Sequence, residues 1–451
     1  MPRCLSLALA VAALLAAPLT AAGGKPGTWT RLHGGNASAA EPGLARTSDG
    51  TLHVVWQRTS GPLRDDVVHQ AIARDGALIG SLSVVTQGWQ SINPHVELAA
   101  VGAGLRAFWA GVTSGPLSGP TVMAASSNGG ATWAAPAAVT ASRWGATAAG
   151  IGTGVTPSGT VAAAQGDAAA GTNIVHVAGG AEVPYETSGC CASAPDVAVD
   201  AVSGQMILGW FSSAAGHTGL WTQAVAASGV VGARAAVPAS ATPPGQRVAI
   251  AGRLGAGGVY VAYGTATSVN LLRIGGSPVV VARGTGIEKV GIAPAPEGRL
   301  WLFWSRGSEY LATRSNRRAT RFGTATKIAL PAIDAKTYGL YGEGSLGPLD
   351  LVAHAGTGAA IPDWHTQVLP RLSLSSSSRT FKRGDRTLVR LTFRVTDVGD
   401  AVRGARVTIA GKSRVTNAQG KASLLLRATG KRVAVRATKD GYAPATTAAR
   451  R

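Results

Sequence analysis

Charged residues are scarce in this chain of 451 residues, at 14%, whereas hydrophobic residues reach 45%. This balance supplies enough apolar side chains for a large core and argues against intrinsic disorder. Long amphipathic helical patterns are also missing after the N-terminus, while 61 glycines and 23 prolines suit many short strands joined by turns. The composition therefore predicts an all-β protein.

Motifs of the common catalytic and metal-binding classes are missing as well. The eight histidines are scattered, and none forms the H-x-x-x-H or mixed Cys/His spacing of a zinc site. There is no G-x-S-x-G nucleophile elbow, no phosphate-binding loop and no EF-hand series. Asp65 and Asp66 are expected in a polar loop, where two adjacent acids could bind a cation but are more often solvated. We expect no metal and no cofactor.

Residues 1–22 have the organisation of a signal peptide. Arg3 supplies a positive charge, residues 5–17 are apolar, and residues 20–22 are small enough for cleavage. The apolar run is shorter than the ~20 residues that a membrane span needs. An uncleaved N-terminal anchor is the alternative. We expect a secreted or cell-envelope protein without a transmembrane anchor.

Export would remove Cys4 and leave two adjacent cysteines, Cys190 and Cys191. In an oxidising compartment these thiols either form a disulfide with each other or stay free. The disulfide would close a minimal ring, contribute little to global stability, and present a rigid apolar surface to a ligand. A buried pair of reduced cysteines is the alternative.

One strand-like pattern recurs along the chain. Residues 52–56 (LHVVW) begin with a leucine and end with an aromatic residue. Further copies occupy residues 105–109, 206–210, 259–263 and 300–304, with weaker ones at 161–165 and 349–353. A strand that recurs every 41 to 56 residues predicts a β-propeller, with the apolar residues packed between blades. We expect six or seven blades within residues 23–370, with residues 28–32 pairing to the last blade and closing the ring.

A second, more specific pattern has the spacing S-x-N-x-G-x-T-W between two apolar stretches that predict a hairpin. Its residues are Ser126, Asn128, Gly130, Thr132 and Trp133. This pattern resembles the Asp-box, or bacterial neuraminidase repeat, of sialidase-type propellers, with Asn128 in place of Asp. Asn can bond to its own backbone, so the turn should survive the exchange. Residues 315–322 contain a degenerate second copy. In that family the box is a folding element away from the active site.

The resemblance to sialidase-like propellers covers roughly residues 45–365. It implies three arginines that clamp a carboxylate, a tyrosine nucleophile paired with a glutamate, and an aspartic acid/base. The family's F-R-I-P motif is absent. The weak candidates for these roles are Arg46, Asp66, Arg247, Arg306, Tyr341 and Glu343. Trp89, Trp144 and Trp364 lie outside the repeated strands and are candidates for stacking on sugar rings, although packing between blades is favoured for each one singly.

Residues 371–451 are expected to form a second domain after a serine-rich linker at 373–378. Val389, Leu391 and Phe393 alternate with polar residues, which predicts a small β-sandwich. Segments 404–409, 416–422 and 439–442 resemble carboxypeptidase-regulatory-like and bacterial Ig-like modules, which implies a spacer or adhesive appendage without catalysis.

The net charge of +20 is concentrated in this second domain. Residues 371–451 contain 19 Lys and Arg against 4 Asp, a balance of +15. Such a field suits an anionic cell-envelope polymer or lipid surface, while solubilising arginines are the alternative. Nucleic acid is disfavoured, because the segment lacks exposed aromatic residues and the protein is expected to be exported.

Three functional hypotheses follow. The preferred one is an exported propeller that binds an extracellular glycan without hydrolysing it, with the basic sandwich holding it at a surface. The alternative enzyme is a sialidase-type glycoside hydrolase that acts on sialosides or related acidic sugars through a covalent tyrosine intermediate. The third is an adhesive or structural surface protein whose propeller is only a scaffold.

Overall fold

The computed structural model describes residues 24–32, 41–62, 64–93, 95–115, 118–145, 148–167, 172–177, 182–185, 192–357 and 361–450. The expected signal peptide at 1–22 and the cysteines Cys4, Cys190 and Cys191 lie outside these residues. The described chain is almost entirely β, with one short 3-10 helix, η1 (Pro296–Gly298). No helix in these ranges is long and apolar enough to cross a membrane.

Seven antiparallel sheets precede residue 370 in the described part of the chain. The first sheet consists of β2 (Gly43–Arg46), β3 (Leu52–Gly61), β4 (Arg64–Ile72) and β5 (Leu78–Trp89). The second consists of β6 (Ser91–Ile92), β7 (Glu97–Val101), β8 (Gly104–Val112), β9 (Ser118–Ser126) and β10 (Ala137–Gly145). The third consists of β11 (Ala148–Val155), β12 (Val161–Asp167), β13 (Thr172–Val177) and β14 (Glu182–Pro184).

The fourth sheet consists of β15 (Ala192–Val199), β16 (Met206–Ser212), β17 (Gly219–Val225) and β18 (Val231–Ala236). The fifth consists of β19 (Ala249–Gly252), β20 (Val259–Gly264), β21 (Ser268–Arg273) and β22 (Pro278–Arg283). The sixth consists of β23 (Ile287–Ala295), β24 (Arg299–Arg306), β25 (Glu309–Arg314) and β26 (Thr326–Ala329). The seventh contains β27 (Lys336–Glu343), β28 (Leu349–Gly356), β29 (Asp363–Val368) and the N-terminal β1 (Thr30–Arg31).

The recurring pattern marks the same position in every sheet. Each of its seven copies lies on the second strand, namely β3, β8, β12, β16, β20, β24 and β28. The closing aromatic residues are buried: Trp56, Trp109 and Trp210 are 0% exposed and Trp304 is 2% exposed. The hydrophobic clusters around them join neighbouring sheets, as expected for apolar residues packed between blades.

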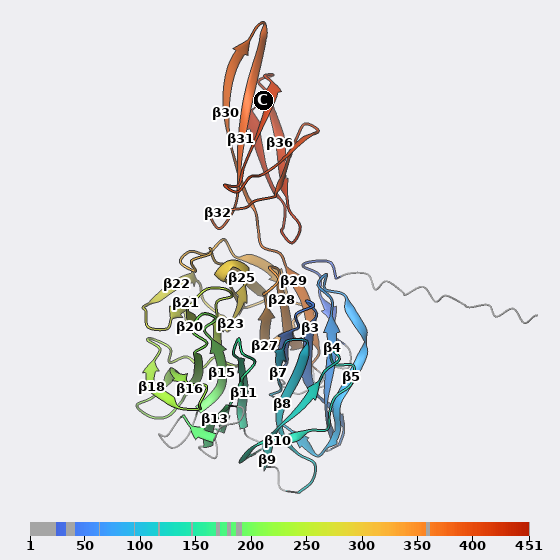
Figure 1. Ribbon diagram of the computed structural model, residues 1–451, viewed down its shortest axis with the longest axis vertical. Coiled ribbons are helices and arrows are strands. Elements are labelled where there is room, and N and C mark those ends of the chain that lie inside the picture. The colour runs from blue at the N-terminus through green and yellow to red at the C-terminus, as the bar shows by residue number, and fades with distance from the viewer. Residues whose placement is uncertain are drawn as a thin grey trace, which may run out of the picture.

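The first strands of the sheets contact one another around the centre of the molecule, and β27 contacts β2 to close the ring (Figure 1). Closure is completed at the periphery, where β1 pairs antiparallel with β29 and Thr30 lies opposite His365. The expected pairing of residues 28–32 with the last blade is therefore confirmed. It leaves the seventh sheet with four strands, one of which comes from the opposite end of the propeller sequence.

Buried charges reinforce the same seam. Arg46 in β2 forms ion pairs with Glu343 in β27 and with Asp350 in β28. Asp350 Oδ1 also lies 2.9 Å from His365 Nε2 and 3.0 Å from Gln367 Nε2 in β29. The Arg46 side chain is only 5% exposed. Because an unpaired buried charge is costly, this network favours the closed ring.

The C-terminal residues form a β-sandwich that stands away from the propeller (Figure 1). Its sheets consist of β30 (Ser373–Arg383), β31 (Arg386–Asp397), β32 (Asp400–Ala401) and β35 (Lys421–Arg427), and of β33 (Arg406–Ile409), β34 (Lys412–Val415), β36 (Arg432–Thr438) and β37 (Ala445–Arg450). The predicted alternation is confirmed, since Val389, Leu391 and Phe393 lie in the core between the sheets. The expected linker at 373–378 is wrong. These serines belong to β30, where pairing with β31 supplies backbone hydrogen bonds and an exposed strand needs few apolar side chains.

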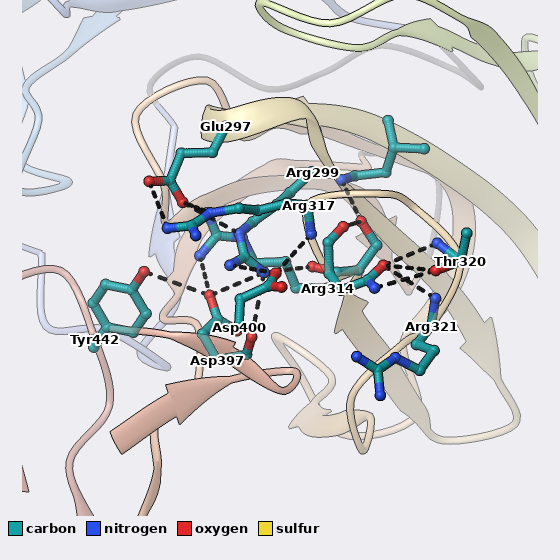
Figure 2. A network of polar contacts seen from close by, with 12 residues as sticks. Glu297, Arg299, Arg314, Arg317, Thr320, Arg321, Asp397, Asp400 and Tyr442 are labelled. Atoms are coloured by element: carbon teal, nitrogen blue, oxygen red, sulfur yellow. Dashed lines mark hydrogen bonds and ion pairs between the residues drawn. The ribbon is translucent and has the colours of Figure 1, made fainter. Parts of the chain in front are cut away.

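A buried ionic network attaches the sandwich to the sixth sheet (Figure 2). Arg299 and Arg314 come from β24 and β25, while Asp397 and Asp400 flank the turn between β31 and β32. Arg299 Nη2 lies 2.8 Å from Asp400 Oδ2, and Arg314 Nη1 lies 3.0 Å from Asp397 Oδ2. Tyr442 donates a hydrogen bond of 3.4 Å to Asp397. Burial raises the pKa of Asp397 above its usual value, although both arginines oppose that shift.

We predict that Asp397→Asn lowers the free energy of unfolding by about 3–5 kcal/mol, because it leaves the buried Arg314 guanidinium group without its carboxylate partner. Arg317→Gln is the matched control. It breaks an ion pair with Glu297 in which both side chains are about half exposed, so its cost should stay below about 1 kcal/mol. Urea unfolding of the full chain, followed by circular dichroism, measures both. Equal losses would contradict the buried attachment.

Two stacked histidines occupy the interior of the first sheet. His53 Nδ1 lies 2.9 Å from His69 Nε2, and both side chains are almost fully buried. His69 Nδ1 lies 2.9 Å from Ser83 Oγ, which donates a 2.8 Å hydrogen bond to the carbonyl of Gly130 in the next sheet. Burial lowers the pKa of His53 to about 4 and that of His69 to about 3.

Acid should destabilise the propeller through this pair. Unfolded histidine titrates near a pKa of about 6.5, so between that value and the folded pKa values of about 4 and about 3 the unfolded chain binds more protons. Their contribution is therefore complete above about pH 7 and is lost as the pH falls through this window. Between pH 7 and pH 5, the free energy of unfolding should fall by roughly 2–4 kcal/mol less in the double variant His53→Gln, His69→Gln than in the parent protein. Urea titrations at both pH values test this, and identical pH slopes would refute it.

Candidate functional site

A cavity of about 770 Å³ lies among the first strands of the sheets. Four of the six predicted catalytic candidates contribute to its wall: Arg46, Arg247, Tyr341 and Glu343. The strands that surround it approach closely where glycine occupies the interface. A Cβ atom on Gly43 of β2 would lie 2.5 Å from the backbone nitrogen of Leu98 in β7. Any larger residue there would push the two strands apart and open the ring.

An ionic cluster surrounds Arg247 where the first strands begin. The Arg247 guanidinium pairs with Glu97, lies 3.6 Å from Glu41, and donates a 2.6 Å hydrogen bond to the carbonyl of Pro42. His95 Nδ1 lies 3.2 Å from Glu41. Burial raises the pKa of Glu41, but His95 and Arg247 outweigh that effect and hold it below its usual value. The guanidinium group is thus already engaged by two carboxylates.

Tyr341 lies against the same arginine. The Arg247 guanidinium carbon is 5.1 Å from the centre of its ring, and the side chain is 7% exposed. Its hydroxyl faces the Glu41 carboxylate without a hydrogen bond of normal geometry. Burial and the nearby Glu41 charge raise the pKa of Tyr341 well above its usual value. The phenol is therefore neutral at physiological pH and presents its ring to the cation.

Asp196 is a cavity-lining carboxyl group that the sequence analysis did not identify. It lies in β15, and its Oδ1 accepts a 2.8 Å hydrogen bond from the backbone N–H of Val197. Burial, reinforced by the negative charge of Glu41, raises the pKa of Asp196 well above its usual value. The only sequence signal is a single acid inside the mostly apolar strand Ala192–Val199. The site thus contains two carboxyl groups, Asp196 and Glu41, whose pKa values are displaced in opposite directions.

Two other catalytic candidates lie elsewhere. Arg306 ends β24 and pairs with Glu309 of the next strand. Asp66 pairs with Arg58 at 2.7 Å. The expectation that Asp65 and Asp66 lie in a solvated loop is wrong, since both belong to β4 and are 9% and 4% exposed. The three arginine candidates therefore do not converge, and the two that line the cavity, Arg46 and Arg247, are each paired with two carboxylates.

Trp89 and Trp364 are not among the described residues that line the cavity. Trp89 packs edge-on against Trp109 in the core between the first two sheets. Trp364 lies in β29 and donates a 3.0 Å hydrogen bond from its indole nitrogen to the carbonyl of Ala355. Trp144 belongs to β10, where its backbone pairs with Gly119, and its side chain lies outside the described part of the structure.

The hairpin between β9 and β10 has the expected strands and a bonded turn. Asn128 Oδ1 accepts a 3.0 Å bond from the N–H of Thr132, and Asn128 Nδ2 donates a 2.8 Å bond to Thr132 Oγ1. Ser126 Oγ accepts a 2.9 Å bond from the N–H of Gly130, whose carbonyl accepts a 3.1 Å bond from the Trp133 indole. A Cβ atom on Gly130 would lie 2.2 Å from the His69 ring, so only glycine fits.

The degenerate copy repeats this arrangement between β25 and β26. Asn316 Oδ1 accepts a 2.9 Å bond from the N–H of Thr320, and its Nδ2 donates a 3.2 Å bond to Thr320 Oγ1. Neither turn lines the cavity. Within the described residues, no group of three or more His, Cys, Asp or Glu side chains is placed to hold a metal ion.

The two cavity residues Arg247 and Tyr341 should differ sharply in their effect on stability. Arg247→Met leaves Glu41 and Glu97 without their shared cation, so we predict a loss of about 3–5 kcal/mol in unfolding free energy. Tyr341→Phe removes a hydroxyl that has no hydrogen-bond partner, and the change should be neutral or stabilising. Urea unfolding followed by tryptophan fluorescence measures both variants. A Tyr341→Phe protein as unstable as Arg247→Met would show that the hydroxyl is bonded.

Comparisons with known proteins give only distant likenesses. No protein-family model matches the chain, and no curated protein matches it. Among solved structures, an α-L-arabinanase from Penicillium chrysogenum complexed with arabinobiose is 12% identical over 75% of this chain and 97% of its own, with a TM-score of 0.42. The Hadza microbial sialidase Hz136 is 10% identical over 73% of this chain and 65% of its own, with a TM-score of 0.41. The polysaccharide lyase Uly1 is 9% identical over 73% of this chain and 90% of its own, with a TM-score of 0.44. The β-propeller fold is established by the sheet order and ring closure described above.

Proposed function

We propose that this protein is exported and binds a neutral carbohydrate in the cavity at the centre of the propeller. The observation that carries this proposal is that the three arginines of the described cavity wall are already engaged. Arg46 and Arg247 pair with carboxylates, and Arg253 donates to the backbone carbonyls of Gly257, Gly298 and Arg317. Among the described residues, Asp196 forms no ion pair and bonds to the backbone N–H of Val197. Asp196 with a raised pKa can donate and accept hydrogen bonds to sugar hydroxyls. The volume of about 770 Å³ is within the range of roughly 300–1,000 Å³ typical of small-ligand pockets.

The same pairing disfavours an acidic sugar as the ligand. A carboxylate ligand needs guanidinium groups with free donors, as in a bidentate clamp. Here Arg253 is held by the backbone carbonyls of Gly257, Gly298 and Arg317. Arg46 is held by Glu343 and Asp350, and Arg247 is held by Glu97 and Glu41. Withdrawing either arginine would leave buried carboxylates unpaired, which costs more than a new ion pair returns. The sialidase-type hypothesis for acidic substrates therefore has less support than neutral-glycan binding.

The wider organisation is part of the proposal. The Asn–Thr bonded turns at residues 126–133 and 315–322 support their assignment as Asp-box-like repeats of a sialidase-like scaffold. The N-terminal 22 residues support export, and residues 23–370 and 371–451 are proposed as the two domains. The basic sandwich, which we propose is an Ig-like or carboxypeptidase-regulatory-like module, holds the propeller at an anionic surface of the cell envelope.

Hydrolysis of a neutral glycoside is the second candidate, and Asp196 is the observation in its favour. A carboxyl group whose pKa is raised can protonate a leaving-group oxygen, and carboxyl pairs with separated pKa values are typical of acid/base sites. Glycoside hydrolysis also needs a second carboxylate beside the substrate. The other two in the wall, Glu97 and Glu343, are each held by an arginine, so binding without turnover remains the first choice.

Calorimetric titration of residues 23–451 with neutral and sialylated oligosaccharides tests the proposal. We expect neutral ligands to bind, and we expect Asp196→Ala to weaken their binding at least tenfold, because it removes a hydrogen-bonding carboxyl group from the wall. Glu309→Gln, which removes one carboxylate outside the cavity, is the control and should bind normally. Tighter binding of sialylated ligands, or full affinity in Asp196→Ala, would contradict the proposal. Release of sugar from neutral aryl glycosides, lost in Asp196→Ala, would establish the hydrolytic alternative.

A further inference from the structure

The outer surface of one sandwich sheet carries an unusual concentration of positive charge. This cationic face consists of the outward residues of β30, β31 and β35. Its charged members are Arg379, Arg383, Arg386, Arg390, Arg394, Lys421 and Arg427. No outward position of the three strands carries a carboxylate, since Asp397 points inward and is 1% exposed. One acid, Asp385, lies in the turn between β30 and β31. Figure 1 shows β30 and β31 extending to the end of the sandwich farthest from the propeller.

Like charges face one another directly across the strands. Arg379 pairs in register with Arg390, and Arg383 with Arg386. Residues opposite one another in antiparallel strands have Cβ atoms about 4.5–5.5 Å apart, and like charges there are destabilising. A third such pair, Arg394 with Lys421, joins β31 to β35. Three repulsive pairs on one face weaken the free sandwich, and a dense anionic partner would remove that repulsion.

Apolar side chains are interspersed among these cations. Phe381 lies opposite Leu388, and the Arg390 guanidinium lies 5.8 Å from the centre of the Phe381 ring. Leu425 lies opposite Arg390 and is 42% exposed. A hydrated polyanion would gain nothing from these groups. A bilayer interface offers phosphate groups to the arginines and acyl chains to the leucine and phenylalanine.

We propose that the cationic face binds the surface of an anionic phospholipid membrane. The inference rests on the surface association proposed above, and it names the binding face and its partner. Charge complementarity supplies the attraction, and each basic residue near an anionic surface contributes a few-fold in affinity. The exposed Leu425 and the Phe381–Leu388 pair supply contact below the headgroups. Binding should weaken as salt screens the charges.

Co-sedimentation of residues 23–451 with vesicles of phosphatidylglycerol and phosphatidylcholine tests this directly. The double variant Arg379→Gln, Arg390→Gln should reduce binding at least tenfold. It should also raise the unfolding midpoint of the sandwich, because a repulsive pair has been removed. The matched control is Arg406→Gln, Arg436→Gln. It removes the same charge from the opposite sheet, where these arginines face Thr438 and Thr408. Its affinity for the vesicles should fall less than threefold.

Each of the other outcomes would refute one part of the membrane-binding proposal. Equal losses in the two double variants would show that net charge acts without this face. Leu425→Ser should weaken vesicle binding while leaving binding to soluble polyphosphate unchanged. A Leu425→Ser protein that binds vesicles normally would point to a polyanionic polymer and refute the lipid assignment. No binding of the parent protein to either partner would refute surface association as a whole. Carbohydrate binding in the cavity, measured without vesicles, is unaffected by all of these results.

Discussion

Closure of the ring is the constraint on which the rest of the propeller depends. Every sheet packs one apolar face on the next, so an open ring would expose the faces of the first and seventh sheets to water. The β1–β29 pairing removes a free edge, and Arg46 joins β2 to the last sheet through Glu343 and Asp350. The cavity exists because the first strands are held in this circle, and its wall therefore contains part of the closing network.

Electrostatic pairing gives that cavity its chemical character. Arg46 stabilises the closure of the ring, and Arg247 stabilises the region where the first strands begin. Both are paired with buried carboxylates. Asp196 is a carboxyl group of the wall outside these ion pairs, and its pKa is raised by burial and by the charge of Glu41. This pairing is why we propose a ligand with hydroxyl groups rather than an anion, because the same charges cannot both hold the fold and clamp a ligand.

The sandwich uses charge in two opposite ways. At its base, Asp397 and Asp400 meet Arg299 and Arg314 in a buried network that attaches it to the sixth sheet. On its outer sheet, cations lie opposite one another in register across the strands. The network joins the end of the propeller where the first strands finish, whereas the Arg247 cluster lies where they begin. The proposed ligand cavity and the proposed surface contact are thus connected through this buried ionic network.

The sequence by itself determined the strand repeats, the closing strand, the bonded hairpin turn and the alternating sandwich core, because period-two patterns and turn chemistry act between near neighbours. It also led to four residues of the cavity wall, Arg46 among them. Only the tertiary structure decided which groups meet there. Asp196, Glu41 and Arg247 are brought together by separate sheets, and their pairing and pKa values depend on burial that no local pattern encodes. Composition alone also misassigned the serine-rich β30, since an edge strand is held by backbone hydrogen bonds that side-chain hydrophobicity does not reveal.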